Sequence, residues 1–458
     1  MSRARRRARR PPGEGHGPFR PLAVVEVELS QPIPAIPARD DDGAQRGAAR
    51  LVVRLHTRTV GLVDVTLGED GLSAEECARA VWAELGPDVD AHLRADGLAS
   101  VAALDAAGLA PLDDPPCGRR RAAVLRAAPS ASVVICTRER AGLLARTLAS
   151  LRDLEYPDYE VLVVDGSAGP ETADLVRDRF PEVRYAGVGA YGRSVALNRG
   201  IAASRGAIVA FTDDDVRVDR HWLAELAAAL AEPGVACATG VAFPLELSTR
   251  AQLWFEESGG FTEGFARRTV GLDAPREPGS LLPFATGKIG AGVSMAWRRE
   301  ALEEIGGFDV ALDTLTPLWP PRARPGSSGE DLSAFFDALV RGHRIVFEPS
   351  AIVYHEHRRT YEELARQIYW HGIGLSGHLT RCLLREPRRI PAFLWSVPRG
   401  LAYGFAGSSA RNHGKSAGFP PALTRIEWRG VAEGPFAYLR GLPRARRIRA
   451  ALAAPEGR

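Results

Sequence analysis

Between residues 131 and 230, apolar segments of strand length alternate with amphipathic segments of helix length. This alternation predicts strands at 131–137, 159–165, 183–188 and 207–216, and helices at 140–154, 171–180, 194–204 and 221–230. Strands separated by helices in this way are typical of a mostly parallel sheet with crossover connections. The predicted fold class is therefore α/β, and a ligand site is expected beyond the carboxyl ends of the strands.

Different patterns on either side of this segment predict further structural units. The segment before it alternates like strands and then becomes amphipathic, with Ser73 and Glu76 at the spacing of a helix capping box. The segment from about 240 to 330 is rich in glycine and proline and is expected to form irregular loops with short strands. The predicted units are a basic disordered tail at 1–20, an α+β accessory domain at 21–128, an α/β domain at 129–380 and a helical, basic region at 381–458.

Composition and charge indicate which partners and which location in the cell are expected. The chain carries 59 basic and 56 acidic residues, so its net charge of +3 does not call for a nucleic-acid partner. Five scattered cysteines without a CxxC pair predict neither a disulfide framework nor a cysteine zinc site, and they favour the cytoplasm. No secretory signal is expected, because no apolar segment follows the N-terminal arginines. Residues 390–407 are apolar but are interrupted by Pro391, Pro398 and Arg399, so at most they lie on the inner face of a membrane.

Three adjacent aspartates, Asp213, Asp214 and Asp215, lie at the end of the predicted strand at 207–216. Their mutual repulsion would be relieved by a divalent cation, and carboxylate oxygens suit Mg²⁺ or Mn²⁺. The alternative is a turn whose acidic residues favour the start of the next helix, although that role explains one aspartate better than three. Asp165 ends another predicted strand and is expected at the same edge of the sheet.

Four ordered motifs carry a resemblance to a known family. They are VVICTRER followed by VLVVDGS, then GRSVALNRG followed by FTDDDV, then GAGVSMAWRR, and finally SGEDLSAFF followed by YHEHR. Over about residues 131–380 the chain resembles the family-2 glycosyltransferases. The resemblance implies a Rossmann-like sheet of the GT-A type, and transfer of a sugar from a nucleotide-sugar donor to an acceptor hydroxyl. It further implies inversion at the anomeric carbon and assistance by Mn²⁺ or Mg²⁺.

The resemblance also implies which residues hold the donor. Thr137 and Arg138 after the first strand, with Asp165 after the second, match the family's nucleotide pocket, where Asp165 would accept a hydrogen bond from the base. Arg193 and Asn198 match the segment that approaches the nucleotide. For Asn198 a role at the start of a helix remains open, since asparagine is a common helix cap.

The family's DxD motif matches Asp213 and Asp215. Asp215 is implied as a direct metal ligand, and Asp213 as a contact to ribose or sugar that also serves the metal, while Asp214 lies in the same donor-binding turn. A histidine late in the family pattern matches His355 better than His357 and would complete the metal shell or contact the diphosphate. For either histidine, a packed or exposed position without a ligand remains an alternative.

The family's ED motif matches Glu330 and Asp331. An inverting transfer needs one base to deprotonate the acceptor hydroxyl, and the resemblance implies Asp331 in that role, with Glu330 as its neighbour near the acceptor or metal. The alternative is a pair of acidic residues that cap the helix beginning there.

Two other functions were weighed against this one. A nucleotidyltransferase would need a glycine-rich loop after the first strand to hold a triphosphate, whereas this chain has CTRERAG there. A non-catalytic carbohydrate-binding protein would have no need of the ordered acidic motifs. The expected partners are a nucleotide-sugar donor, a carbohydrate, lipid-linked or small-molecule acceptor and, through the basic C-terminal region, a membrane surface.

Overall fold

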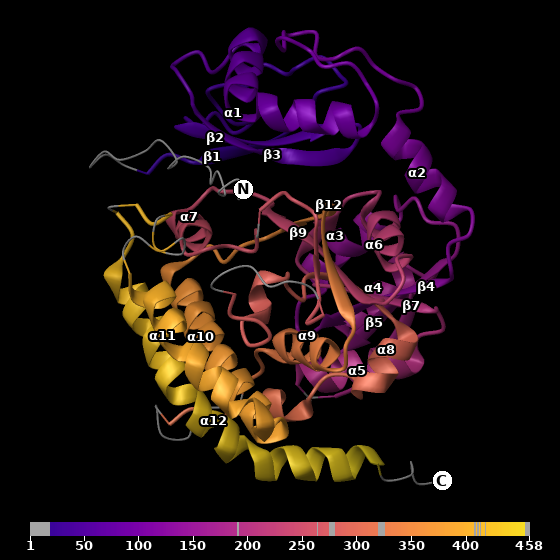
Figure 1. Ribbon diagram of the computed structural model, residues 1–458, viewed down its shortest axis with the longest axis vertical. Coiled ribbons are helices and arrows are strands. Elements are labelled where there is room, and N and C mark those ends of the chain that lie inside the picture. The colour runs from indigo at the N-terminus through magenta and orange to yellow at the C-terminus, as the bar shows by residue number, and fades with distance from the viewer. Residues whose placement is uncertain are drawn as a thin grey trace.

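The computed structural model describes residues 19–189, 192–262, 264–273, 280–318, 326–406, 409, 412, 414–416 and 418–453 (Figure 1). The predicted disordered tail at 1–20 lies almost wholly outside these residues. Within them the chain forms a three-stranded sheet, a nine-stranded sheet and a set of C-terminal helices.

The predicted alternation of strands and helices forms one half of the large sheet. Its parallel strands lie in the order β7-β4-β5-β6. The elements of this half are β4 (Ala131–Thr137), α3 (Ala141–Leu151), β5 (Tyr159–Asp165), α4 (Glu171–Arg179), β6 (Arg184–Gly187), α5 (Arg193–Ala203), β7 (Ile208–Thr212) and α6 (Trp222–Leu230). The predicted α/β fold class is confirmed.

The other half of the sheet is mixed. β11 lies between β7 and β9 and is antiparallel to both, whereas β12 is parallel to β9. β10 and β8 each pair antiparallel with β12. The elements are β8 (Val216–Val218), β9 (Val235–Pro244), α7 (Arg250–Glu257), β10 (Arg268–Val270), η1 (Thr286–Lys288), β11 (Ser294–Arg298), α8 (Arg299–Ile305), η2 (Val310–Thr314), α9 (Glu330–Val340) and β12 (Arg344–His355). The segment expected to be irregular therefore contains the second half of β9 and the helix α7.

The core explains why the central strands are almost continuously apolar. In β4, Val133 and Ile135 pack into the core on one face of the sheet, and Val134 packs into the core on the other face. Strands covered by helices on both faces need apolar residues at successive positions, because every side chain is buried. In β4, β5 and β7 the polar residues lie toward the strand ends, and Thr137, Asp165 and Thr212 are at the carboxyl ends, where the ligand site was predicted.

The N-terminal unit has its own sheet and its own core. Its strands are β1 (Leu22–Glu28), β2 (Ala48–Leu55) and β3 (Arg58–Thr66), with β1 parallel and β3 antiparallel to β2. Helix α1 (Ala74–Ala95) begins at the predicted capping box of Ser73 and Glu76. Helix α2 (Pro116–Leu125) then leads from this unit to the large sheet (Figure 1).

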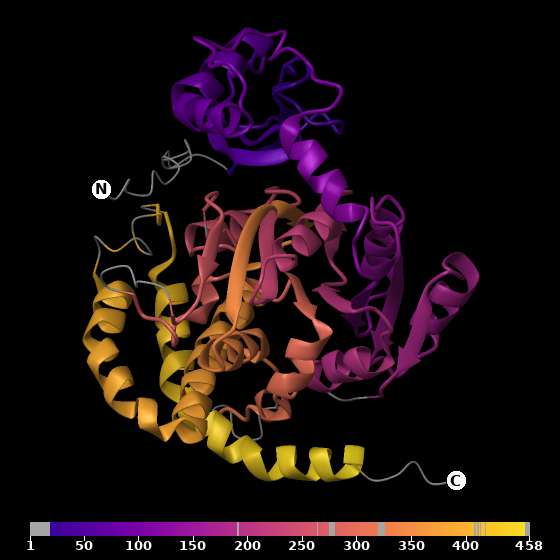
Figure 2. The same cartoon turned by 45° about the vertical axis from the view of Figure 1, so that its right-hand side comes forward.

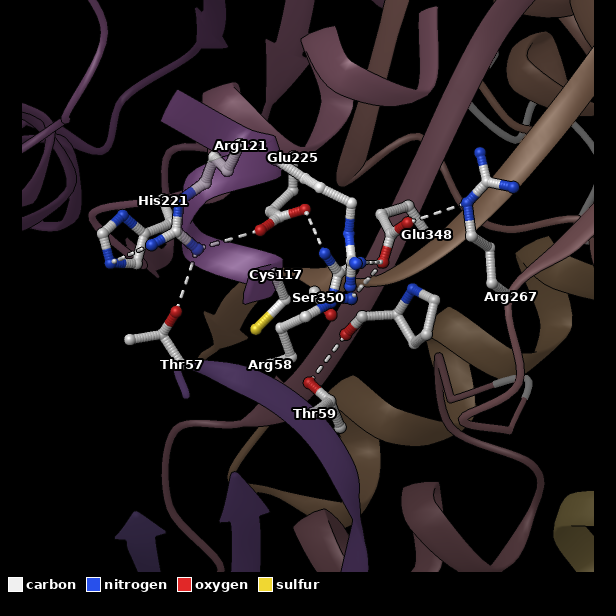
Figure 3. A network of polar contacts seen from close by, with 12 residues as sticks. Thr57, Arg58, Thr59, Cys117, Arg121, His221, Glu225, Arg267, Glu348 and Ser350 are labelled. Atoms are coloured by element: carbon white, nitrogen blue, oxygen red, sulfur yellow. Dashed lines mark hydrogen bonds and ion pairs between the residues drawn. The ribbon is translucent and has the colours of Figure 1, made fainter. Parts of the chain in front are cut away.

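A network of charged side chains joins this unit to the α/β domain (Figure 3). Arg121 on α2 donates to Thr57 Oγ1 at 2.9 Å and to Glu225 Oε1 on α6 at 3.0 Å. Arg58 donates to Glu348 Oε1 on β12 at 3.1 Å and lies 3.4 Å from Glu225 Oε2. Because Glu225 and Glu348 are buried, these pairs fix the two units against each other.

The C-terminal region is helical, as predicted, and lies along one flank of the α/β domain (Figure 2). It comprises α10 (Tyr361–Arg385), η3 (Pro387–Arg389), α11 (Ile390–Phe405) and α12 (Pro421–Ala453). Gly372 of α10 and Gly430 and Gly434 of α12 let the two helix backbones meet closely, since a β-carbon at Gly430 would lie 2.3 Å from Tyr369 O. Among the described residues, no helix has both the length and the apolarity required to span a bilayer.

Candidate active site

The three aspartates lie at the carboxyl end of β7, beside the end of β4. Thr137 Oγ1 donates to Asp214 Oδ2 at 2.7 Å, and Arg140 Nη1 donates to Asp214 Oδ1 and to Asp215 Oδ2, each at 3.0 Å. Burial raises the pKa of Asp214, and Asp215 adds to this effect, while Arg140 opposes it. Asp213 is half-buried, so the cluster has two buried carboxyl groups and one that reaches the surface.

Asp215 also faces His355, which ends β12. Its Oδ1 lies 3.3 Å from His355 Nε2, and its Oδ2 lies 3.4 Å from Arg358 Nη1. Burial alone would raise the pKa of Asp215, but His355, Arg358 and Arg140 outweigh burial and hold that pKa below its usual range. Ligand atoms of Asp213, Asp215 and His355 all lie within 4.8 Å of one another. Two carboxylates and one imidazole are donors that suit Mn²⁺ and leave further coordination positions for phosphate oxygens.

A chain of hydrogen bonds leads from His355 into the N-terminal unit. His355 Nδ1 lies 2.9 Å from His357 Nδ1, and His357 Nε2 lies 2.9 Å from Glu256 Oε1 on α7. Arg50 on β2 donates to Glu256 Oε2 at 2.7 Å and binds both carboxylate oxygens of Asp64 on β3. The accessory unit is therefore in contact with the groups that support the candidate metal site.

This chain of hydrogen bonds orients the two rings and bears on whether a cation fits between His355 and Asp215. Burial raises the pKa of Glu256, but His357 and Arg50 outweigh burial and lower it, while burial lowers the pKa of His357. An ionised Glu256 accepts a hydrogen bond from His357 Nε2. A neutral His357 therefore has its lone pair on Nδ1, where it accepts a hydrogen bond from His355 Nδ1. His355 Nε2 then lies 3.3 Å from Asp215 Oδ1, a separation at which one divalent cation would bind both atoms. The residues present thus fit a divalent metal.

Arg193, the first residue of α5, contacts both acidic motifs. Its guanidinium donates to Asp213 Oδ1, and its Nε lies 2.9 Å from Glu330 Oε1. Burial would lower the pKa of Arg193, but Asp213 and Glu330 raise it well above its usual value. One side chain consequently spans the acidic turn after β7 and the start of α9.

The position of α5 depends on Asp313, which sequence reasoning missed. Asp313 Oδ1 and Oδ2 accept from the backbone N–H groups of Ser194 at 2.7 Å and Val195 at 3.0 Å. Asn198, predicted at the nucleotide, instead donates to Phe308 O and accepts from Phe308 N, both at 2.8 Å. The structure gives Asn198 a packing role within α5, and its nucleotide contact stays a prediction.

Glu330 and Asp331 open α9, but they do not act as the N-cap pair considered above. The cap residue is Gly329, whose φ of 85° lies in the left-handed region, and no side chain caps this helix. Asp331 accepts from Gly292 N at 2.9 Å and from Leu332 N at 2.7 Å. Both of its oxygens are therefore oriented by backbone groups.

The environments of the two carboxyl groups differ. Glu330 Oε2 is buried and has no hydrogen-bond partner among the residues that the structure describes. Burial raises the pKa of Glu330 to about 7, with Arg193 opposing the effect and Asp331 adding to it. Burial also raises the pKa of Asp331, although its two backbone hydrogen bonds oppose that. Asp331 is the more exposed of the pair.

The predicted base-recognition residue, Asp165, lies at the end of β5 opposite Thr137. It is buried, and it accepts from Ser167 N at 2.8 Å and from the Tyr185 hydroxyl at 2.9 Å. Arg138 follows β4 and is exposed at the same edge. The ends of β4, β5 and β7 therefore bring the predicted donor residues Thr137, Arg138 and Asp165 to the edge that carries the aspartates.

Fold and site together define an open α/β enzyme-like domain with a candidate cation site at the carboxyl edge of its sheet. Residues 132–306 match the family model described as Glycosyl transferase family 2. The chain therefore contains a glycosyltransferase family 2 domain, which confirms the family predicted from its motifs.

Several known proteins are similar to this chain. The pre-mycofactocin glycosyltransferase of Mycobacterium tuberculosis is 28% identical over 243 residues, which cover 53% of this chain and 46% of that protein. The chain thus spans about half the length of this relative. The glucosyl-dolichyl phosphate glucuronosyltransferase of Haloferax volcanii is 24% identical over 53% of this chain and 74% of that protein. Among solved structures, the mannosyltransferase PcManGT from Pyrobaculum calidifontis in complex with GDP-Man and Mn²⁺ aligns over 68% of this chain and 86% of that chain, with 20% identity and a TM-score of 0.41.

Proposed function

We propose that this protein transfers a sugar from a nucleotide-sugar donor to an acceptor hydroxyl, with metal assistance and inversion at the anomeric carbon. The observation that carries the proposal is the position of Arg193 between Asp213 and Glu330. A donor diphosphate and an acceptor base have to lie within a few ångströms of the same sugar carbon. One guanidinium that contacts both acidic motifs supports such an arrangement.

Asp213, Asp215 and His355 would hold Mn²⁺ or Mg²⁺, which neutralises the charge that develops on the departing nucleotide diphosphate. Arg140 and Arg358 already contact the same aspartates and can stabilise phosphate oxygens beside them. These groups would stabilise the leaving group, so no acid has to protonate it.

Thr137, Arg138 and Asp165 would bind the nucleoside at the ends of β4 and β5. Asp214 would keep this edge in register, because it accepts from Thr137. The Asp165 carboxylate accepts from Ser167 and from the Tyr185 hydroxyl, which fixes its orientation toward a base.

Asp331 would remove the proton from the acceptor hydroxyl. Its exposure exceeds that of Glu330, and two backbone N–H groups orient it. A pKa raised by burial makes it a stronger base than an ordinary aspartate. Glu330, paired with Arg193, would position that cation rather than accept the proton.

The first test compares Asp331→Asn with Asp178→Asn, a substitution in an exposed ion pair on α4. Loss of a general base lowers turnover by about 10²- to 10⁴-fold. Release of nucleotide from UDP-, GDP- and TDP-sugars is measured with Mn²⁺, and donor binding is followed by thermal shift. The proposal expects Asp331→Asn to lose turnover but to keep the donor-induced shift, while Asp178→Asn keeps both. Full turnover in Asp331→Asn would remove the base assignment, and no shift with any nucleotide-sugar would remove the donor class.

The acceptor is proposed to be presented at a membrane surface. On α11, Leu394 and Trp395 are 62% and 74% exposed, and Arg399 lies over the Trp395 ring. Apolar side chains flanked by arginines are typical of helices that lie in the interface of anionic bilayers. The name of the archaeal relative, which includes a dolichyl phosphate-linked sugar, fits a lipid-linked acceptor.

Flotation with vesicles of phosphatidylglycerol and of phosphatidylcholine tests this surface at low salt. Binding is expected only to the anionic vesicles and is expected to be lost in Trp395→Glu. The control is Leu112→Glu, which places the same charge at an exposed leucine of the accessory unit. Equal flotation of both variants would contradict the membrane contact.

A further inference from the structure

Four potential metal ligands meet in the N-terminal unit, about which the sequence analysis proposed no chemistry. His56 comes from the turn between β2 and β3, His92 and Asp96 come from the end of α1, and Cys117 comes from the first turn of α2. One ligand atom of each lies within 4.8 Å of all the others. His56, Asp96 and Cys117 are buried, and His92 is half-buried.

The distances between these ligand atoms fit a tetrahedral zinc site. Zinc bonds of about 2.0–2.1 Å to nitrogen and about 2.3 Å to sulfur place two nitrogens about 3.3 Å apart, and nitrogen and sulfur about 3.6 Å apart. His56 Nδ1 lies 3.2 Å from His92 Nε2, and Cys117 Sγ lies 3.8 Å from His92 Nε2. Asp96 Oδ2 lies 3.6 Å from each of the two histidine nitrogens.

Hydrogen bonds from neighbouring groups orient the Asp96 carboxylate. Cys117 N donates to Asp96 Oδ2 at 3.2 Å, and Arg120 donates to Asp96 Oδ1. Hydrogen bonds to a ligating carboxylate are typical of groups that support a metal site.

The turn that carries His56 gives an independent indication. His56 and Thr57 have φ values of 53° and 68°, so both lie in the left-handed region. A two-residue hairpin turn of this kind normally contains Asn-Gly, and a β-branched threonine is strained there. Glu28 accepts from His56 N and Thr57 N at 2.9 Å each, which holds the turn in place. The sequence thus keeps an unfavourable residue pair in a conformation that directs His56 toward the other three ligands.

We propose that His56, His92, Asp96 and Cys117 bind one structural Zn²⁺. Two neutral imidazoles, one carboxylate and one thiolate balance the charge of the ion, and four protein ligands leave no open position for catalysis. The prediction that a cysteine zinc site is absent rested on the lack of a CxxC pair. It missed this cluster because its ligands come from segments far apart in the sequence.

The site would tie α2 to the accessory unit beside the interface with the catalytic domain. Cys117 and Arg121 lie one turn apart on α2, and Arg121 binds Thr57 next to His56 as well as Glu225 of α6 (Figure 3). Zinc would thereby fix the helix whose arginine joins the two units. Its removal would loosen the interface without removing any residue of the candidate active site.

The experiment uses the full-length protein and elemental analysis after gel filtration. About one zinc per chain is expected, and Cys117→Ser is expected to weaken zinc binding at least about 100-fold. Cys77→Ser is the matched control, because Cys77 is a buried cysteine of α1 outside the cluster. Asp215→Asn should weaken Mn²⁺ binding yet retain the zinc, so failure of the proposed transferase site can be distinguished from failure of this one.

Cobalt substitution of the unaltered protein guards against a variant that does not fold. Co²⁺ in a tetrahedral site with one thiolate gives intense visible bands and a thiolate charge-transfer band in the near ultraviolet. Both features are expected, and Zn²⁺ should abolish them. No zinc in the purified protein and no such spectrum after Co²⁺ addition would overturn the proposal, leaving the four residues as a hydrogen-bonded cluster.

Discussion

Arg50 is one of the buried side chains that join the two folded units. It lies on β2, binds Asp64 in a bidentate pair and donates to Glu256 of the catalytic domain. The side chains of Arg50, Asp64 and Glu256 are 8%, 3% and 8% exposed, so all three charges are buried. Substitution Arg50→Met keeps most of the side-chain volume and removes the cation.

The expected loss in the free energy of unfolding follows from the two carboxylates that Arg50→Met would leave without their cation. Breaking a buried ion pair by removing one partner costs about 3–5 kcal/mol, because the remaining charge is uncompensated. The matched control is Arg94→Met, where the arginine pairs with Asp90 four residues earlier on α1 and is 60% exposed. An exposed pair of this kind contributes about 0.5 kcal/mol or less.

Urea unfolding measures both variants, and Mn²⁺ binding shows whether the damage reaches the candidate active site. Arg50→Met is expected to lower the free energy of unfolding by about 3–5 kcal/mol and also to weaken Mn²⁺ binding, since Glu256 loses the cation that orients it toward His357. A loss in Arg50→Met no larger than that in Arg94→Met would refute the reasoning, because the buried charges would then have found other compensation.

Three further predictions concern the helices and the candidate site. Gly434→Ala should lower the free energy of unfolding by about 1–3 kcal/mol, because the new β-carbon would lie 1.9 Å from Ser376 Oγ. Gly400 has open space around it, so Gly400→Ala should raise the free energy of unfolding by about 0.5–1 kcal/mol. Equal effects of the two substitutions in urea unfolding would contradict this prediction. Burial raises the pKa of Glu330 to about 7 in the folded protein, so its protonated form contributes stability that is fully present below about pH 4.5 and is lost as the pH rises through 7. The free energy of unfolding of the wild type, minus that of Glu330→Gln, should therefore fall over that pH range. A constant difference would refute the prediction. Glu256→Gln should weaken Mn²⁺ binding about 10-fold in calorimetry, while circular dichroism should show an intact fold. Unchanged Mn²⁺ affinity would show that the hydrogen bonds through His357 do not support the metal site.

Local periodicity was sufficient to predict the parallel half of the sheet. Between 131 and 230 every helix, and every strand except β8, follows from the apolar pattern, since each buried element must be apolar where it meets its neighbours. The position of the aspartates at the sheet edge follows from the same logic, because Asp165 and Asp213 end strands that run in the same direction. Residues that follow a strand can therefore be placed in space without knowledge of distant contacts.

The remaining site residues depend on contacts between distant segments, which no local pattern reports. Glu256 lies on α7, within a segment predicted to be irregular, and it meets His357 across a separation of 101 residues. Arg50 reaches the same glutamate from another folded unit, 206 residues away. Cys117 is an isolated cysteine in the sequence, and only the fold brings it close to two histidines. The single signal available was the two histidines at alternate positions of YHEHR.

The C-terminal helices belong to the architecture of the candidate site, although no predicted site residue lies on them. Asp309 is buried, and it pairs with Arg381 of α10 and Arg449 of α12, which together hold the start of η2. Asp313, one turn further along η2, accepts from the first backbone N–H groups of α5 and so sets where Arg193 begins that helix. A shift of α12 against α10 would move η2, and Arg193 would then lose its place between the two acidic motifs. The C-terminal region, whose α11 we propose as the membrane contact, therefore also positions through α10 and α12 the cation at the centre of the proposed transfer, so acceptor capture and donor alignment would share one structural support.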